Sequence, residues 1–434
     1  MDKYIIGKLP NELEYIILDI PNSYSISVCV SIKVGSNDEE PRVNGISHLL
    51  EHMIYKSNKK FKTKYDLYRE LDSIGASYNA YTDKNITTFF VKSHHKYQEK
   101  LIDIFSSLLC EPDVKSEELD NERNVVIEEI SNSRDEPFDC IYNRFFSLIY
   151  GDKTAIAQKI SGSVENIENI SVDDVKNHLQ RFYTAKNMVV SIAGRVHNGI
   201  EEYLKRSNFV KAPQSIYNYS NKKLLKHIKS TTIDFVHKPI KQVFLGIGFP
   251  TDGLLDEDRY IVKLIELILN GSMSSRLFVK LREEEGLVYS ISTSSSNYEE
   301  GGVFFCITSF EKEKYVNVLD SLFSEFKRIQ NELLDESELN RWKNFVSSQM
   351  VLDMENGMDI ADYYARQLLF YPKNIIDFEK MLAIFEKITA NDIQRVAQKI
   401  FNWKYMKIVI LGDYSIHGKE MANNVLAVVK KNYS

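Results

Sequence analysis

The chain has 434 residues, of which 43% are hydrophobic and 27% are charged, and its formal net charge is −6. This length predicts two or more domains, and the composition is ordinary for a globular protein. The mild negative charge gives no support for nucleic acid as the main partner. No apolar run approaches the roughly 20 residues that span a bilayer, and the N-terminus resembles neither a signal peptide nor a transit peptide. We therefore expect a cytoplasmic protein without membrane insertion.

The first elements in chain order are a strand pattern over 25–36 and the apolar stretch ISHLLEHMIY over 46–55. In this stretch His48, Glu51 and His52 fall at i, i+3 and i+4, which places them on one face of a helix. Three polar groups in apolar surroundings cost free energy unless a partner satisfies them. Two imidazoles one turn apart can bind zinc, and the glutamate of an inverted His-x-x-Glu-His motif can deprotonate water. The alternative is a helix whose histidines cap a core or pair with carboxylates.

Three further patterns follow: a strand over 85–94, a helix over 96–109 and a helix over 116–133. A third zinc ligand should be a carboxylate on another helix, and NERNVVIEEI offers Glu122, Glu128 and Glu129. Glu122 and Glu129 are seven residues apart and share a helical face. Glu128 lies about 100° around the helix from Glu129, so only one of these two can face a metal ion. The residues alone leave the choice between Glu128 and Glu129 open. The preceding strand ends at His94 and His95, which we interpret as surface residues.

The chain contains an internal repeat. Ile170–Gly194 and Ile388–Gly412 align without a gap at an offset of 218 residues. Each segment is typical of a helix, a short connection and a strand that ends at glycine, and Ser171 and Thr389 are suited to cap the two helices. The repeat favours a gene duplication, and hence two halves of similar fold.

The predicted organisation is an N-terminal half over 1–210, a polar connector over 211–230 and a C-terminal half over 231–434. The second half has strand patterns at 241–249 and 301–310. Strands adjacent in sequence with helices in blocks favour an α+β fold. Each half should form a mostly antiparallel sheet packed with helices, and the halves should close as a clam-like chamber. Four widely spaced cysteines are expected to be reduced thiols: Cys29, Cys110, Cys140 and Cys306.

HLLEH, followed 77 residues after His52 by Glu129 within ERNVVIEEI, resembles the pitrilysin family of inverted-motif zinc peptidases. The likeness is greatest to the mitochondrial processing peptidase subgroup and covers nearly the whole chain. It implies that His48, His52 and Glu129 bind one zinc ion per chain. It also implies that Glu51 is the general base and that Glu122 supports the metal site. The expected activity is hydrolysis of short unstructured peptides or presequences by zinc-activated water.

The second half resembles the first without its metal ligands. At an offset of 215 residues, Lys263 and Leu267 replace the two histidines, so we expect no zinc there. The family resemblance implies instead that Arg282 and Tyr289 hold the substrate and stabilise charge on the attacked carbonyl. In the first half, it implies that an extended peptide adds as a strand beside Asn79 and Ala80.

Two other functions stay open. The chain could be a non-catalytic structural or assembly subunit of the same fold, or a catalytic subunit that needs a separate partner chain. The intact HLLEH motif together with Arg282 and Tyr289 favours the enzyme. We expect peptide substrates as its partners and either a homodimer or a heterodimer.

Overall fold

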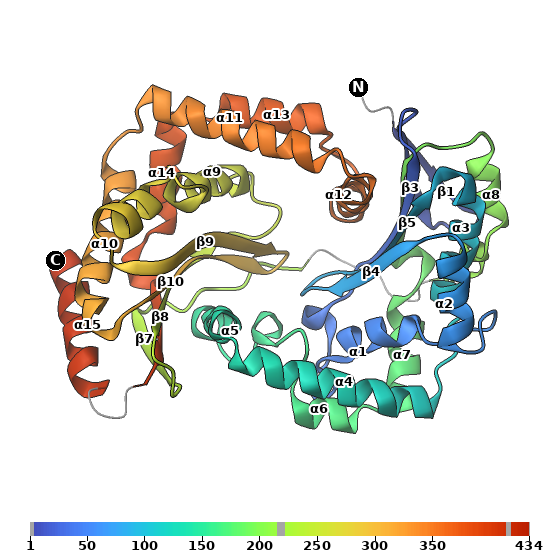
Figure 1. The fold of residues 1–434 in the computed structure, drawn as a ribbon, viewed down its shortest axis with the longest axis horizontal. Coiled ribbons are helices and arrows are strands. Elements are labelled where there is room, and N and C mark those ends of the chain that lie inside the picture. Colours follow the sequence, from blue (N-terminus) through green and yellow to red (C-terminus); the bar gives the residue numbers. More distant parts are fainter. Residues whose placement is uncertain (1–3, 215–221, 414–417, 434) are drawn as a thin grey trace. The chain divides into compact units, whose positions relative to one another are not determined.

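The computed structural model describes residues 4–214, 222–413 and 418–433 (Figure 1). The chain divides into two compact units, and neither is continuous in sequence. Unit 1 consists of Met1–Ser131, Gln158–Ser220 and Gln349–Met381; unit 2 consists of Asn132–Ala157, Asn221–Ser348 and Leu382–Ser434. The units therefore differ from the predicted halves, because 132–157 belongs with unit 2 and 349–381 with unit 1. The predicted connector includes 215–221, which lie outside the described residues.

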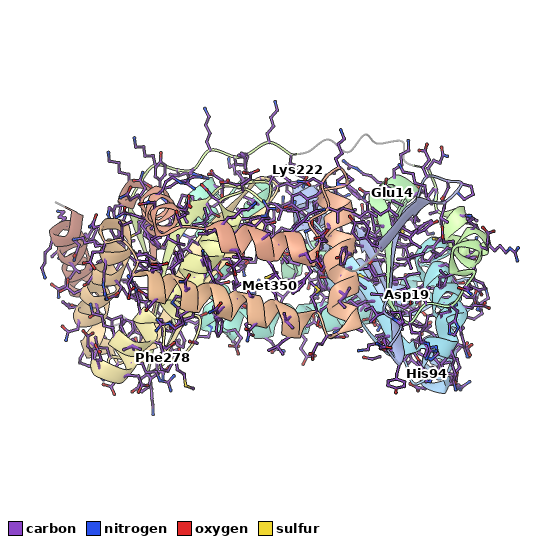
Figure 2. All side chains as sticks on the ribbon, turned by 90° about the horizontal axis from the view of Figure 1, so that it is seen from above. Glu14, Asp19, His94, Lys222, Phe278 and Met350 are labelled. Atoms are coloured by element: carbon purple, nitrogen blue, oxygen red, sulfur yellow. The ribbon has the colours of Figure 1, made fainter. Side chains whose placement is uncertain are left out.

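In the described residues of unit 1, six strands form one mixed sheet in the order β1-β2-β6-β3-β5-β4. Its strands are β1 (Tyr4–Lys8), β2 (Glu14–Asp19), β3 (Ser25–Ile32), β4 (Ser77–Thr82), β5 (Thr87–His94) and β6 (Met188–Gly194). Its helices are α1 (Ile46–Ile54), α2 (Lys64–Ser73), α3 (Gln98–Cys110), α4 (Ser116–Asp135), α6 (Val164–Asn169), α7 (Val172–Phe182), α8 (Ile200–Arg206) and α12 (Gly357–Phe370). The β2–β6 pair is parallel and the other pairs are antiparallel. Figure 2 marks the two ends of β2 at Glu14 and Asp19.

Both faces of this sheet are buried. One face packs against α1, α3 and α7 in a large apolar core. The opposite face packs against α12, whose Ile360, Tyr364 and Leu368 contact the other set of strand side chains. Because side chains alternate across a strand, a sheet covered on both faces buries both sets of β3 side chains, and all but its first residue are buried, Ser27 and Ser31 included. Thus α12, which comes from the second half of the sequence, covers a sheet whose strands all come from the first half.

In the described residues of unit 2, five strands form a sheet in the order β7-β11-β8-β10-β9. Its strands are β7 (Thr232–His237), β8 (Val243–Thr251), β9 (Val288–Tyr298), β10 (Gly301–Phe310) and β11 (Lys407–Gly412). Its helices are α5 (Pro137–Tyr150), α9 (Arg259–Asn270), η7 (Phe278–Glu284, a π-helix), α10 (Tyr315–Asn331), α14 (Ala390–Ile400) and α15 (Gly418–Tyr433). Three of the five boundaries between the units fall within helices, in α4, α11 (Glu336–Asp353) and α13 (Phe378–Lys387). Short 3₁₀ turns occur at η1 (Ser36–Asp38), η2 (Pro41–Val43), η3 (His95–Tyr97), η4 (Ala155–Ala157), η5 (Ala185–Asn187), η6 (Asn208–Lys211), η8 (Lys312–Lys314) and η9 (Trp403–Tyr405).

Helix α5 covers the sheet of unit 2 as α12 covers that of unit 1 (Figure 1). It lies close to β8 because two glycines leave room for its rings. A Cβ atom at Gly246 would lie 2.3 Å from Ile141 Cγ2, and one at Gly248 would lie 2.5 Å from Phe145 Cδ1. Glycine at these two positions therefore sets how closely the helix can pack.

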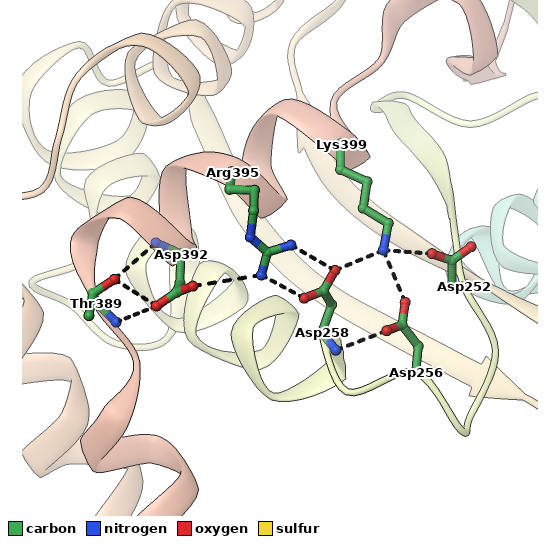
Figure 3. Close-up of polar contacts among 7 residues, drawn as sticks. All are labelled: Asp252, Asp256, Asp258, Thr389, Asp392, Arg395 and Lys399. Carbon is green, nitrogen blue, oxygen red and sulfur yellow. Dashed lines mark hydrogen bonds and ion pairs between the residues drawn. The ribbon is translucent and has the colours of Figure 1, made fainter.

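The predicted repeat is confirmed as α7 followed by β6 and α14 followed by β11. Ser171 and Thr389 both form capping boxes, with Asp174 and Asp392 as the reciprocal partners. Figure 3 shows how the second copy is held. Arg395 pairs with Asp258 at 2.8 Å, before α9 begins. Lys399 contacts three carboxylates at 2.7–3.1 Å: Asp252, Asp256 and Asp258.

The predicted α+β class, with two sheets each packed with helices, is confirmed. Among the helices of the described residues, none is both long and apolar enough to cross a bilayer. The four cysteines are free thiols, as predicted.

Phe145→Ala should lower the free energy of unfolding by about 3–5 kcal/mol, because the ring is fully buried between α5 and β8. Urea unfolding followed by circular dichroism measures the change. Tyr24→Ala, at an aromatic residue that is 82% exposed, is the control and should change stability little. Equal stability of Phe145→Ala and wild type would show that α5 does not form the core of this unit.

Candidate metal centre

The His-x-x-Glu-His motif lies on α1, a short helix whose other sides are buried. Leu49, Leu50 and Met53 pack into the core of unit 1, and the helix has only nine residues. Such a short helix needs a defined start. Glu39 supplies it, because its carboxylate accepts hydrogen bonds from the backbone N–H groups of Gly45 at 2.7 Å and Ser47 at 2.8 Å. Burial raises the pKa of Glu39 to about 7, although these hydrogen bonds oppose the rise.

The chain reaches this helix through a tight turn. Gly45 has a φ of 101°, a conformation that L side chains rarely adopt. A Cβ atom there would also lie 2.7 Å from the Ser161 carbonyl oxygen. In the first turn of α1, the Ser47 hydroxyl lies 3.2 Å from Nε2 of the buried His178 on α7. The start of the motif helix is therefore fixed by a carboxylate, a close backbone approach and a buried imidazole.

His48 and His52 meet one carboxylate from α4. Oε2 of Glu129 lies 3.6 Å from His48 Nε2 and 3.5 Å from His52 Nε2. One ligand atom from each of these three residues falls within 4.8 Å of the other two, and in the described part of the chain this is the one such group of three or more possible ligands. Ligand atoms about 2.0–2.2 Å from a tetrahedral zinc ion lie about 3.3–3.6 Å apart. The observed separations fit that spacing.

Glu122, one of the two carboxylates on the same face of α4, supports the group from behind. Its side chain is 7% exposed, and its Oε2 lies 3.5 Å from His52 Nδ1. Lys56 Nζ lies 2.9 Å from the other oxygen of Glu122. A carboxylate at Nδ1 leaves Nε2 of His52 free to act as a metal ligand. Glu128 and Glu129 are both exposed, and of these two only Glu129 is among the grouped donors.

Burial and neighbouring charges shift the pKa values of the two imidazoles in opposite directions. Burial, and secondarily the neighbouring His52, lower the pKa of His48 to about 4, so it is neutral at pH 7. Burial also disfavours charged His52, but the carboxylates of Glu122 and Glu129 outweigh it and raise its pKa. Nδ1 of His48 is buried and has no hydrogen-bond partner among the described residues. A divalent cation satisfies such a set better than protons do, because it offsets two carboxylates while the imidazoles stay neutral.

Glu51 points into the same area without joining the ligand group. Its Oε2 accepts a hydrogen bond from the Thr82 hydroxyl at 2.5 Å. Burial raises the pKa of Glu51 above its ordinary value, and Thr82 and His52 oppose that rise. A carboxylate with a raised pKa beside a metal site has the properties of a general base.

The other predicted residues take these places. Asn79 is exposed on β4, the edge strand of the sheet, and its carbonyl oxygen accepts a hydrogen bond from Tyr55 at 2.9 Å. The Ala80 N–H donates to the Asn79 side chain. In unit 2, Arg282 lies on η7 with its guanidinium 5.1 Å from the Phe278 ring centre, and the half-exposed Tyr289 donates to Glu311. The structure does not test their predicted roles.

The second-half helix that matches α1 is α9, and it has different chemistry. Lys263 replaces the first histidine and pairs with Glu266 at 2.9 Å, and Leu267 replaces the second. Glu266 occupies the position that corresponds to Glu51. His94 lies exposed at the end of β5 (Figure 2), and His95 lies 2.9 Å from His197.

Sequence reasoning missed three residues around the motif: Glu39, Lys56 and Thr82. Glu39 and Lys56 gave no signal, since isolated charged residues are usually solvated. Thr82 lies two residues after Ala80 in a segment already singled out, and strand alternation could have placed the two side chains on one face.

Comparison with known proteins identifies the family. Residues 16–156 match the family model described as insulinase (peptidase family M16), and residues 169–346 match the model of the peptidase M16 inactive domain. The chain belongs to the M16 peptidase family. A Rickettsia bellii protein named as an uncharacterized zinc protease is 28% identical to this M16 chain over 410 residues, which are 94% of this chain and 98% of that protein.

Solved structures share the fold. A protease from Helicobacter pylori superposes with a TM-score of 0.87 at 22% identity, over 95% of this chain and all of that one. A chain of complex III from Candida albicans has a TM-score of 0.78 at 15% identity, over 97% of this chain and 99% of that one. The predicted zinc metallopeptidase of the pitrilysin family is thus confirmed at the level of the family. The processing peptidase subgroup stays a prediction.

Glu129→Gln should lower zinc affinity by more than Glu122→Gln does. Because Glu122 only supports a ligand, we expect Glu122→Gln to lower the affinity about 10- to 100-fold. The reason is that Glu129 reaches both Nε2 atoms, whereas Glu122 contacts only the far side of one ring. Metal analysis after dialysis against graded zinc buffers measures both losses. Glu128→Gln makes the same change on an exposed neighbour and should leave zinc binding intact. Unchanged binding by Glu129→Gln would remove it from the ligand set.

His178→Gln should make the protein less sensitive to acid. Burial lowers the pKa of His178 to about 3, whereas an unfolded histidine has a pKa of about 6.5. Between about pH 6.5 and pH 3, His178 therefore binds a proton in the unfolded chain but not in the folded chain. The free energy of unfolding falls as the pH falls through this range. Between pH 7 and 5, wild type should lose about 2 kcal/mol more than the variant in urea unfolding. Equal losses would contradict this origin of the acid sensitivity.

Proposed function

We propose that this zinc metallopeptidase is an endopeptidase that hydrolyses short, unstructured peptides or presequences, with Glu51 as the general base. The observation that carries the proposal is the meeting of three donors from His48, His52 and Glu129 beside a carboxylate that is not itself one of them. Three protein ligands leave a tetrahedral ion with a fourth position for solvent, which is the composition of a hydrolytic site.

The donor set fits zinc by its chemistry. Two imidazoles and one carboxylate are ligands that zinc accepts, and the two Nε2–Oε2 separations of 3.5 and 3.6 Å fit a tetrahedral site. When bound there, zinc supplies a Lewis acid that acidifies water and polarises a carbonyl group. Glu122 would hold the His52 ring in the orientation that keeps Nε2 directed at the ion.

Glu51 would move the protons of the reaction. Its raised pKa lets it take a proton from the attacking water and then deliver that proton to the leaving amine. One oxygen of Glu51 is engaged by Thr82, which leaves Oε1 for the water. The same carboxylate thus acts first as a base and then as an acid.

The substrate would be bound through its backbone. β4 ends the sheet of unit 1, so an extended peptide could add beside Asn79 and Ala80 as a further strand. Main-chain pairing reads length and flexibility more than side-chain identity, which favours unstructured peptides. We assign Arg282 to clamping the substrate and Tyr289 to stabilising charge on the attacked carbonyl, as the family resemblance implies. We further propose a homodimer, for which light scattering of the purified chain is the measurement.

Glu51→Gln should retain zinc and lose cleavage by about 100-fold or more, because the amide cannot accept the proton. Purified protein is assayed for metal content and for cleavage of a panel of unstructured peptides by mass spectrometry. Glu266→Gln is the matched control, since it makes the same change at the corresponding position of α9 and should cleave like wild type. Wild type that holds zinc but cuts no peptide would defeat the proposed function and would favour a non-catalytic subunit.

A further inference from the structure

The Thr82 hydroxyl is the group that bonds to the Glu51 carboxylate. It donates to Oε2 at 2.5 Å, a short distance typical of a hydroxyl on an ionised acceptor. We propose that Thr82 is a positioning residue for Glu51. Its hydroxyl fixes Oε2 of the general base, so that Oε1 stays directed toward the attacking water. The inference rests on the proposed function and adds a residue to it.

Glu51 needs such a restraint because of its surroundings. A glutamate has three rotatable side-chain bonds, and His52 follows it directly in the chain. Without a fixed donor, the carboxylate could turn toward the imidazoles or the ion and become a ligand instead of a base. A single hydroxyl engages only one of the two oxygens, so it restrains the carboxylate without blocking its reactive oxygen.

Thr82 is itself held firmly, which a positioning residue requires. It is the last residue of β4 and pairs with Thr87 on β5. The residue before it, Tyr81, projects to the opposite face of the sheet, where its hydroxyl lies 2.5 Å from Asp362 Oδ1 and accepts from Arg366 at 2.8 Å. Both partners are on α12, and Arg366 also lies 3.2 Å from Asp362.

The strand is also held at Asn79, near its middle. Tyr55, directly after α1, donates to the Asn79 carbonyl oxygen at 2.9 Å. The motif helix and β4 are therefore joined at two points, Tyr55 to Asn79 and Glu51 to Thr82, while α12 braces the strand from behind. This arrangement places the Thr82 hydroxyl at a set distance from α1.

The alternative is that Thr82 only stabilises the fold by satisfying a half-buried carboxylate. The two roles differ in what they predict. A stabilising contact would affect unfolding, and its loss would act on every property of the site alike. A positioning contact would affect the chemical step through Glu51 alone, and would have no effect once Glu51 can no longer act as a base.

The experiment compares Thr82→Val, which keeps the shape without the hydroxyl, with Thr82→Ser, which keeps the hydroxyl. Thr87→Val is the matched control, because it removes a buried hydroxyl from the paired residue, where the partner is the Val34 carbonyl oxygen. We expect Thr82→Val to lower kcat about 10- to 100-fold, the range for a lost hydrogen bond to a charged group. KM and zinc content should stay at the wild-type value, Thr82→Ser should recover most of the loss, and Thr87→Val should keep the wild-type kcat.

A double-mutant cycle ties the effect to the base. Thr82→Val should have no further effect on the residual cleavage of Glu51→Gln. A readout without activity is the crystal structure of zinc-loaded Thr82→Val, in which the Glu51 carboxylate should leave the position it keeps in Thr87→Val. Full activity of Thr82→Val, an equal loss in the Glu51→Gln background, or an unmoved carboxylate would each overturn the inference.

These outcomes are distinct from failure of the proposed function. If wild type binds zinc but cuts no peptide, the proposed function fails, and the position of Glu51 in the two crystal structures still decides whether Thr82 holds it. If wild type cuts and Thr82→Val cuts equally well, only the role of Thr82 fails.

Discussion

Two imidazole nitrogens one helical turn apart, facing one carboxylate oxygen at 3.5–3.6 Å, are the constraint on which the site depends. The helix fixes the separation of His48 and His52, so the remaining requirement is that α4 brings Glu129 to the same point. Glu122 and Lys56 make this arrangement tolerable in partly buried surroundings, because each charge near the histidines has an opposite charge or a ring nitrogen beside it. Without a cation, the two Nε2 atoms and the Glu129 carboxylate meet with no positive ion between them to balance that carboxylate.

The surrounding fold fixes the position of α1 relative to β4. Glu39 sets the first turn of α1, Tyr55 ties its end to β4, and the apolar residues between them anchor it in the core. The sheet then transmits a further restraint from α12, through Tyr81, to the edge where Thr82 meets Glu51. A nine-residue helix is too short to be stable by itself, so its position depends on these contacts.

Much of this was predictable from sequence, and the reason differs by feature. The helix face of His48, Glu51 and His52 follows from spacing alone, and the repeat of α7 and β6 in α14 and β11 follows from alignment and N-cap residues. The choice of Glu129 over Glu128 needed the family comparison, because both project from the same helix. The roles of Glu39 and Thr82 depend on contacts between residues far apart in the chain, 8 and 31 residues in the two bonds concerned, and no local pattern encodes such pairs.

The assignment of α12 to unit 1 and of α5 to unit 2 has a consequence for how the chain can be divided. Each sheet has a buried apolar face that packs against a helix encoded on the other side of the 211–230 connector. A fragment cut there would carry an uncovered sheet and, in addition, a helix without its own sheet. Proteolysis at the connector would therefore leave two pieces, each of which carries a helix that belongs to the other's sheet.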